Sequence, residues 1–376
     1  MPDPFDLAWE ALRRSLPLDV LEGKMDEARQ KLGRVNILIA GKTGVGKTTL
    51  VNAVFGAKVG RTGTGAPITT GITWYEPPGL PLRLCDTRGL ELAAYEETLA
   101  ALKRELLKSS ASNRIEDRLH LAWLCISERS ARVEKAEKQV AKMCSEHGVP
   151  VIVVVTQAFG KEEFVTAIRE LIPEAKAIVP LMAEAEKIPP FPAYGLPKLV
   201  KETERFLPHA VENAFIAAQQ VDIDSKRSIA TKLAIVAASG AMAAAFIPIP
   251  LAGTAGLIAS NASMVAGIAA TMGVVMDRKS ILALAASLAG GLAASSGGRL
   301  LLGEALKLVP GAGTVAGTVV EASVAGATTY GLGIGLIEFL LWFHSGNERM
   351  PDGSELKEGF TRFWANRPNK EIIPPR

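Results

Sequence analysis

Residues 35–50 read VNILIAGKTGVGKTTL, and this stretch determines the fold that we expect for the first half of the chain. Its first six residues form an apolar run rich in β-branched side chains, as in a strand buried on both faces of a sheet. Gly41 to Thr48 follow the pattern G-x-x-x-x-G-K-T, and Leu50 to Phe55 are compatible with a helix. A glycine loop between a strand and a helix lets successive backbone N–H groups point at phosphate oxygens. The stretch therefore predicts a phosphate-binding site rather than a chance glycine-rich turn.

The same loop supplies side chains for a nucleotide and a metal ion. Lys47 is expected to reach the β- and γ-phosphates as a catalytic residue, and the Thr48 hydroxyl is expected to ligate Mg²⁺. The positive end of the following helix attracts the anion. The nucleotide-binding residues expected here are Gly41, Thr43, Gly44, Val45, Gly46, Lys47, Thr48 and Thr49.

Two later segments complete the predicted phosphate and metal site. Residues 60–71, GRTGTGAPITTG, are rich in glycine and hydroxyl residues, and such a loop can order when a γ-phosphate and Mg²⁺ are bound. We expect the Thr69 hydroxyl to be a further Mg²⁺ ligand and Thr69 to be a catalytic residue. Asp86 follows the expected strand 82–85 and begins the pattern D-x-x-G, so its carboxylate is the third expected metal ligand. The N–H of Gly89 is expected to sense the γ-phosphate.

These three motifs together resemble those of small-GTPase-type domains, and they are most similar to the Era-like group and the immunity-related GTPases. The resemblance covers roughly residues 35–182 and implies GTP and GDP as ligands, Mg²⁺ and a switch driven by the γ-phosphate. Arg88 lies inside D-T-R-G and could stabilise γ-phosphate charge in cis or across a dimer, or be a solvated loop arginine. Leu90 stands where Ras-type enzymes place a water-orienting glutamine, so we expect slow intrinsic hydrolysis.

The motif for the nucleotide base is incomplete. The expected strand 149–155 ends in Thr156-Gln157-Ala158-Phe159, where the family would place T/N-K-x-D. Thr156 and Gln157 are the expected nucleotide-binding residues, and Phe159 stands in place of the acid or could stack on the base. A missing carboxylate leaves guanine donors unpaired, so guanine preference rests on the resemblance and ATP stays a rival ligand.

The second half of the chain differs in composition. No charged residue occurs from Leu233 to Met276, and Ile247-Pro248-Ile249-Pro250 divides this run into two segments, each about long enough to cross a bilayer. Dense alanine and glycine allow helix backbones to approach closely, in a membrane hairpin or in a buried soluble bundle. The I-P-I-P break and the glycine-rich runs after it resemble the YcjF-type hydrophobic domain, which follows GTPase domains in bacterial proteins.

The expected fold is an α/β P-loop GTPase domain, with a mostly parallel sheet and helices on both faces, plus an Ala/Gly-rich all-α hydrophobic domain. We place the GTPase domain at 34–207 and the helical domain with a charged tail at 208–376. Amphipathic helices are expected at residues 1–33, where they could pack on the helical domain or form a cap on the sheet. Lys and Arg number 42 against 39 Asp and Glu, and basic residues are scattered, so no nucleic-acid partner is expected. Three widely spaced cysteines are typical of reduced thiols in a cytosolic protein.

The sequence thus predicts a bacterial, Mg²⁺-dependent GTP-binding protein with slow GTP hydrolysis. Its nucleotide state would control a helical domain associated with lipid at the inner face of the membrane, in a cytoplasmic protein. One alternative is a nucleotide-binding switch that barely hydrolyses its ligand. Another is a wholly soluble protein whose apolar helices form an ordinary core or a nucleotide-dependent homodimer interface.

Overall fold

The fold of this chain consists of two compact units. The computed structural model describes residues 32–56, 67–69, 72–87, 95–187, 190–245, 252–274, 276, 280–281, 284, 318–347, 350–351, 355–356, 359–360 and 363. One unit spans Leu32 to Ile223, and the other contains the described residues from Asp224 onward. The amphipathic helices predicted within residues 1–33 lie, up to residue 31, outside the described residues.

A seven-stranded sheet forms the centre of the first unit, with strand order β2-β3-β4-β1-β5-β6-β7. Strand β3 is antiparallel to β2 and β4, whereas all other neighbouring strands are parallel, which confirms the predicted mostly parallel sheet. The strands are β1 (Val35–Ala40), β2 (Pro67–Thr69), β3 (Ile72–Tyr75), β4 (Leu82–Thr87), β5 (Leu121–Ser127), β6 (Val151–Thr156) and β7 (Ala175–Pro180). A separate two-stranded ribbon pairs β8 (Glu186–Lys187) with β9 (Pro190–Phe191).

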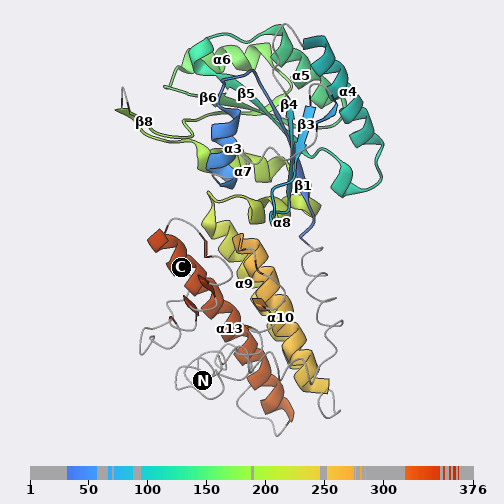
Figure 1. Ribbon diagram of the computed structural model, residues 1–376, viewed down its shortest axis with the longest axis vertical. Coiled ribbons are helices and arrows are strands. Elements are labelled where there is room, and N and C mark those ends of the chain that lie inside the picture. The colour runs from blue at the N-terminus through green and yellow to red at the C-terminus, as the bar shows by residue number, and fades with distance from the viewer. Residues whose placement is uncertain are drawn as a thin grey trace. The chain divides into compact units, whose positions relative to one another are not determined.

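Helices cover both faces of this sheet, as predicted (Figure 1). They are α3 (Lys47–Phe55), α4 (Tyr95–Ala111), α5 (Lys135–Glu146), α6 (Glu162–Leu171), α7 (Leu196–Phe206) and α8 (His209–Ala218), with 3-10 turns η1 (Ile115–Asp117) and η2 (Glu128–Ser130). Side chains alternate along β1: Ile37 and Ile39 belong to the core under α3, α7 and α8, whereas Leu38 belongs to the core under α4, α5 and α6. A strand buried on both faces therefore needs apolar residues at nearly every position, which explains the apolar run of the sequence.

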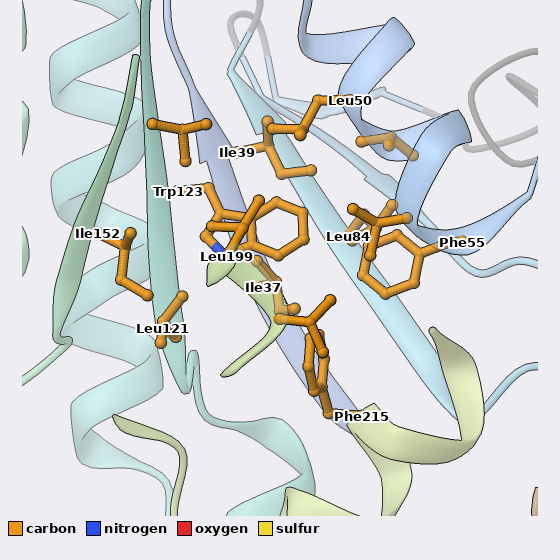
Figure 2. Close-up of a cluster of buried hydrophobic side chains, with 14 of the residues drawn as sticks. Ile37, Ile39, Leu50, Phe55, Leu84, Leu121, Trp123, Ile152, Leu199 and Phe215 are labelled. Carbon is orange, nitrogen blue, oxygen red and sulfur yellow. The ribbon is translucent and has the colours of Figure 1, made fainter. Parts of the chain in front are cut away.

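Aromatic side chains tie α3 and α8 to the sheet (Figure 2). The ring of Phe55 stacks on Trp123 at a centroid distance of 5.6 Å and meets the edge of Phe215 at 6.1 Å. The indole N–H of Trp123 donates to the Thr203 hydroxyl at 3.0 Å, so the buried polar atom of this large ring is paired. The helix that begins in the glycine loop is thereby held against the sheet along its length.

Helix α8 belongs to the sheet unit, in contrast to the predicted boundary after Leu207. Val211, Ala214 and Phe215 of α8 are fully buried in the core that contains β1 and α3. The observed division of the described residues therefore falls after Ile223. The reason is that the apolar side of α8 completes the sheet's own core, which a change in composition along the chain does not reveal.

The chain between α8 and the next helix is attached to the far end of α3. The backbone N–H of Gln220 donates to the carbonyl of Val54 at 2.8 Å, and its side-chain amide donates to the carbonyl of Phe55 at 3.2 Å. Gln219 accepts the N–H groups of Val221 and Asp222 through its side-chain oxygen. The last carbonyl groups of α3, which have no partner inside the helix, are thus satisfied by this connection.

In the described residues of the second unit there are three long helices, α9 (Ile223–Ala245), α10 (Ala252–Met272) and α13 (Thr318–Asn347). This agrees with the predicted Ala/Gly-rich helical domain. A Cβ atom added to Gly333 of α13 would lie 2.6 Å from the Cβ of Ala234 and 2.8 Å from the sulfur of Met264. Only a glycine permits this close approach of the three backbones, as expected from the density of small residues.

Buried polar groups also join these helices. The ammonium group of Lys226 is fully buried and donates to the carbonyl of Thr271 in the last turn of α10 at 3.0 Å. Burial lowers the pKa of Lys226 to about 7. Arg227 of α9 forms an ion pair with Glu338 of α13 at 2.6 Å, and Thr329 donates to Asn261 at 2.9 Å. These bonds fix the register of helices whose apolar side chains alone would specify it weakly.

One helical segment among the described residues has the length and hydropathy of a membrane-crossing helix. This segment is Ala325–Asn347, with a mean hydropathy of 1.3, and 61% of its most apolar window is buried within the protein. The core helix of a soluble protein has the same properties, so the segment by itself does not distinguish the two settings.

Candidate nucleotide-binding site

A pocket of about 560 Å³ lies at the carboxyl end of the central strands. Its wall comes from the β1–α3 loop, the end of β4 and the residue after β6. The lining residues are Thr43, Gly44, Gly46, Lys47, Thr48, Thr49, Asp86, Thr87 and Gln157. Ligands of open α/β sheets bind in this position, because the loops that follow parallel strands meet there. The structure thus brings together residues from Thr43 to Gln157, which are more than a hundred positions apart in the sequence.

The backbone of the β1–α3 loop depends on its glycines at two positions. Gly46 precedes α3 with φ at 93°, in the left-handed region that favours glycine. A Cβ added to Gly41 would lie 2.5 Å from the carbonyl oxygen of Cys125 on β5, so only glycine fits there. The first turn of α3 contains no acidic residue, and its N-terminal N–H groups can therefore receive an anion.

Lys47 is held inside the loop by its own backbone. Its ammonium group donates to the carbonyls of Gly41 at 2.7 Å and Lys42 at 2.9 Å. Lys47 lines the pocket, and its ammonium group has a third N–H that a phosphate oxygen can accept. Lys42 in turn forms an ion pair with Glu134, the residue before α5, which links the loop to that helix.

The oxygen atoms in the pocket suit a magnesium ion. Thr48 and Asp86, the two predicted ligands whose side chains the structure describes, both line the pocket. Asp86 stands on β4 opposite Ile39 of β1 and Thr73 of β3. Mg²⁺ is commonly held by one or two protein oxygens together with substrate phosphates and water, so this donor set fits the ion. No group of three His, Cys, Asp or Glu side chains occurs among the described residues, and such a set would favour another metal.

Three predicted nucleotide-binding residues support the loop without lining the pocket. The Thr156 hydroxyl donates to the carbonyl of Val45 at 2.5 Å and so connects the end of β6 to the loop. The Val45 side chain is buried, and the Gly41 carbonyl accepts from Lys47. Burial raises the pKa of Cys125, under the loop, to about 12, so this thiol stays protonated at neutral pH.

Other predicted residues lie outside the described part of the chain. Arg88 and Gly89 are not described, nor is the side chain of Thr69, although the backbone of Thr69 forms the end of β2. Leu90 is likewise outside the described residues. Their expected roles in catalysis, metal binding and γ-phosphate sensing therefore stay predictions.

The loop after β6 is fixed by a buried carboxylate that the sequence analysis did not identify. Glu128, only 1% exposed, accepts the backbone N–H of Phe159 at 2.5 Å and that of Lys161 at 2.8 Å. The Phe159 ring lies 5.2 Å from Phe191 and 5.3 Å from the Arg129 guanidinium. The proposed stacking of Phe159 on a base is not what this arrangement favours, because the ring does not line the pocket.

Thr87, Ser127 and Glu128 are further residues of the site region that sequence reasoning missed. Thr87 lines the pocket directly after Asp86. Ser127 ends β5 and Glu128 follows it, and β5 lies between β1 and β6 in the sheet. A signal was present, because polar residues after a buried strand that neighbours the P-loop strand lie at the ligand-binding edge.

Two protein families match successive parts of the chain. Residues 36–157 match the family described as 50S ribosome-binding GTPase. Residues 216–358 match the family described as a domain of unknown function, DUF697. The first range contains the whole pocket wall, and the second contains the three long helices up to Asn347.

Similar proteins include one curated relative and several solved structures. Magnetosome membrane protein 22 of Magnetospirillum gryphiswaldense is 33% identical over 93 residues, which is 25% of this chain, and the chain spans only 48% of that relative's length. A probable GTP-binding protein engB matches with a TM-score of 0.33 and 18% identity, covering 46% of this chain and 98% of that one.

Era, in complex with MgGDPNP and part of 16S ribosomal RNA, matches with a TM-score of 0.32 and 21% identity. The match covers 47% of this chain and 58% of the Era chain. Toc33 from Arabidopsis thaliana matches with a TM-score of 0.32 and 20% identity, and the match covers 52% of this chain and 91% of the Toc33 chain. The narrower Era-like and YcjF-type assignments stay predictions. The two family matches, together with the fold and the pocket, show that residues 36–157 are similar to a GTPase family and that residues 216–358 are similar to the DUF697 family.

Proposed function

We propose that this protein binds GTP together with Mg²⁺, hydrolyses it slowly and uses the bound nucleotide to control its helical domain at a membrane surface. The observation that carries the proposal is the pocket in which Lys47, Thr48 and Asp86 converge at the carboxyl end of the sheet. The match of residues 36–157 to a GTPase family supports GTP as the nucleotide.

The proposed chemistry relies mainly on positioning and charge. The N–H groups of residues 43–49 would surround the phosphates, and Lys47 would donate to the β- and γ-phosphates. Mg²⁺, when bound by Thr48, Asp86 and Thr69, would neutralise part of the phosphate charge. Arg88 would add positive charge near the γ-phosphate. Leu90 cannot orient an attacking water, so turnover is expected on the order of 10⁻³ per second or slower without a partner.

Removal of the Lys47 ammonium group tests the enzymatic part. In Lys47→Ala, phosphate release from GTP is expected to fall by at least about a hundredfold, because one fixed charge at the developing phosphate charge contributes on that scale. The matched control is Lys142→Ala, on an exposed lysine whose contact is an ion pair with Glu146. Equal turnover in Lys47→Ala and the parent protein would contradict the proposal, and turnover near zero in both would favour a binding switch.

The membrane part rests on apolar side chains exposed to solvent in the helical unit. Ile235 and Val236 of α9 are 50% and 69% exposed, and Trp342 of α13 is 58% exposed. Lys232 precedes the apolar part of α9, and a basic residue at that position suits an anionic lipid surface. The similarity over 93 residues to a magnetosome membrane protein supports the same setting.

Sedimentation with vesicles tests this part. The full-length protein with Mg²⁺ and GTP is expected to pellet with vesicles containing anionic lipid, and the double variant Ile235→Glu, Val236→Glu is expected to stay in solution. The control is Leu107→Glu, which changes an equally exposed leucine on α4 of the other unit. A protein that stays in the supernatant with GTP, with GDP and without nucleotide would remove the membrane claim.

A soluble switch is the second candidate, and the packing of the helical unit favours it. Leu336, Ile337, Phe339 and Leu340 of the apolar helix α13 are nearly fully buried within the unit's own core. In this case the exposed apolar residues would join two copies of the chain in a nucleotide-dependent homodimer. Light scattering with and without GTP would then show a doubled mass, whereas the membrane proposal requires no such change.

A further inference from the structure

Gln157 is the residue after β6 that lines the pocket, and the protein fixes its conformation. Its φ of 49° lies in the left-handed region, which is uncommon for a residue with a side chain and marks a position held by its surroundings. The Ser127 hydroxyl, at the end of the neighbouring strand β5, donates to Oε1 of Gln157 at 2.6 Å. This bond connects the two strand ends at the base side of the pocket.

The same serine determines which way the Gln157 carboxamide faces. The Ser127 oxygen accepts the backbone N–H of Arg129 at 3.2 Å, so its hydroxyl proton is available for donation. With the amide turned around, Ser127 would face two donors and its own proton would have no acceptor. The oxygen of Gln157 is therefore the atom turned toward Ser127, and the –NH₂ group is left as a hydrogen-bond donor for the pocket.

The acceptors close to Gln157 are engaged within the protein. Both carboxylate oxygens of Glu128 accept backbone N–H groups of the loop. Among the described residues of the pocket wall, Asp86 is the only carboxylate. It stands on β4, three strand spacings from β6, or about 14 Å at about 4.8 Å per spacing. Because Asp86 lies this far from Gln157, we expect it to face the phosphates and the metal ion and not the base.

We propose that Gln157 reads acceptor atoms of a purine base and that the 2-amino group of guanine is not recognised, so that inosine triphosphate binds as well as GTP. The inference rests on the proposed function, because it names the ligand class of the same pocket. Guanine and hypoxanthine both present acceptors at O6 and N7, and they differ in the 2-amino donor. Adenine shares N7 but presents a donor at position 6.

The expected differences in affinity between GTP, ITP and ATP follow from the hydrogen bonds that the pocket can form with each base. Sites that accept a hydrogen bond from a ligand group reject the analogue without it by large factors, because their own buried group is then unpaired. Here the described pocket wall has no carboxylate on the Gln157 side that would pair with the 2-amino group, so GTP and ITP are expected to bind within about threefold of each other. ATP, which loses the acceptor at position 6, is expected to bind at most about tenfold more weakly than GTP.

Calorimetric titration of the full-length protein tests the inference, with Mg²⁺ and the non-hydrolysable analogues of GTP, ITP, ATP and UTP. Similar dissociation constants for the GTP and ITP analogues would support it. A preference of about thirtyfold or more for the GTP analogue over the ITP analogue would overturn it while leaving the proposed function intact. Absence of binding by every analogue to a folded protein would instead overturn the proposed function itself.

Substitutions at Gln157 provide a readout that a merely structural role would not produce. Gln157→Glu replaces the donor by an acceptor and is expected to weaken the GTP and ITP analogues and to favour the ATP analogue, which presents a donor at position 6. Gln157→Leu is expected to weaken the GTP and ITP analogues equally, and the matched control Gln139→Leu, on α5, is expected to change neither. Glu184 is exposed in the loop after β7. A change of the GTP-to-ITP ratio in Glu184→Gln would identify an acceptor outside the pocket wall and would overturn the inference.

Discussion

His120, just before β5, is a buried histidine whose neutral form the fold requires. It is 4% exposed, and its Nδ1 accepts the backbone N–H of Asn36 on β1 at 2.9 Å. Its Nε2 lies 2.8 Å from the carbonyl of Ile115, so the proton is on Nε2 and is donated there. Burial lowers the pKa of His120, with smaller lowering by Arg118 and Arg34, against the Ile115 hydrogen bond and Glu116.

Because the pKa of His120 is lower in the folded than in the unfolded protein, its contribution to stability is complete above about pH 6.5. The contribution decreases as the pH falls below that value toward the folded pKa, since protonation of Nδ1 removes the acceptor for Asn36. In His120→Asn, whose side-chain oxygen can replace Nδ1 as an acceptor but does not titrate, the decrease is expected to be smaller. Urea unfolding of both proteins between pH 5 and pH 8 measures this difference. An identical pH dependence in the two would contradict it.

Glu204 titrates in an overlapping pH range, and its effect on stability has the opposite sign to that of His120. Burial, followed by the charges of Asp222 and Glu212, raises the pKa of Glu204 to about 7, against Lys201. A carboxyl group whose pKa is raised by folding costs stability as the pH rises from its unfolded value toward 7. The comparison at His120 is therefore best made in a Glu204→Gln background, where this opposing change is absent.

At the scale of single elements, the helical unit depends on glycines within α13. Gly333 faces Ala234 of α9 and Met264 of α10, with no space for a side chain. Gly333→Ala is expected to lower the free energy of unfolding of this unit by about 1–3 kcal/mol, as overpacking of a filled core does. Gly346, near the end of the same helix, has no atom within 4 Å of an added Cβ.

Gly346→Ala is therefore the matched control, and it is expected to be neutral or to stabilise the helix by up to about 1 kcal/mol. Chemical denaturation followed by circular dichroism measures both variants. Equal effects of the two substitutions would show that helix propensity rather than packing decides stability at Gly333.

Elements with strong local signals could be predicted from the sequence. The strand, glycine loop and helix around Gly41 to Thr48 and the acid at Asp86 have fixed spacings that the phosphate chemistry imposes. The last strand of the sheet, β7 (Ala175–Pro180), has a much weaker local signal. Only Val179 of β7 is buried, so this edge strand lacks the continuous apolar run that marks the central strands.

Site features made by tertiary contacts could not be predicted in the same way. Glu128 holds the loop after β6 by accepting the backbone N–H groups of residues 159 and 161. Because every residue type except proline has such an N–H group, the sequence does not reveal this contact. The orientation of Gln157 depends on Ser127, thirty positions earlier in the chain. Such partners are determined by strand order, which a single sequence does not specify.

At the scale of the whole molecule, the position of α8 determines where the chain can be divided. A fragment of residues 32–223 contains the complete sheet unit and both of its cores. It is expected to fold alone and to bind the GTP analogue with an affinity within about threefold of the full-length protein. A fragment of residues 32–207 loses Val211 and Phe215, each fully buried, and is expected to be several kcal/mol less stable, at about 3–5 kcal/mol for one buried phenylalanine.

Thermal unfolding and calorimetric titration of the two fragments test this division. The control is a fragment of residues 32–245, which retains α8 and adds α9. Equal stability of the fragments ending at 207 and 223 would contradict the assignment of α8 to the sheet unit. Failure of the 32–223 fragment to bind nucleotide, while full-length protein binds, would mean that the helical unit completes the site.

Helix α3 has nine residues, and at 1.5 Å per residue it is about 13 Å long. Its first turn lines the pocket, and its last carbonyls hold Gln220, three residues before α9 begins. A nucleotide in the pocket and the connection at Gln220 would therefore contact opposite ends of the same short helix. We therefore expect that a shift of α3 on loss of a phosphate would move the connection to α9 without passing through the loops around the γ-phosphate.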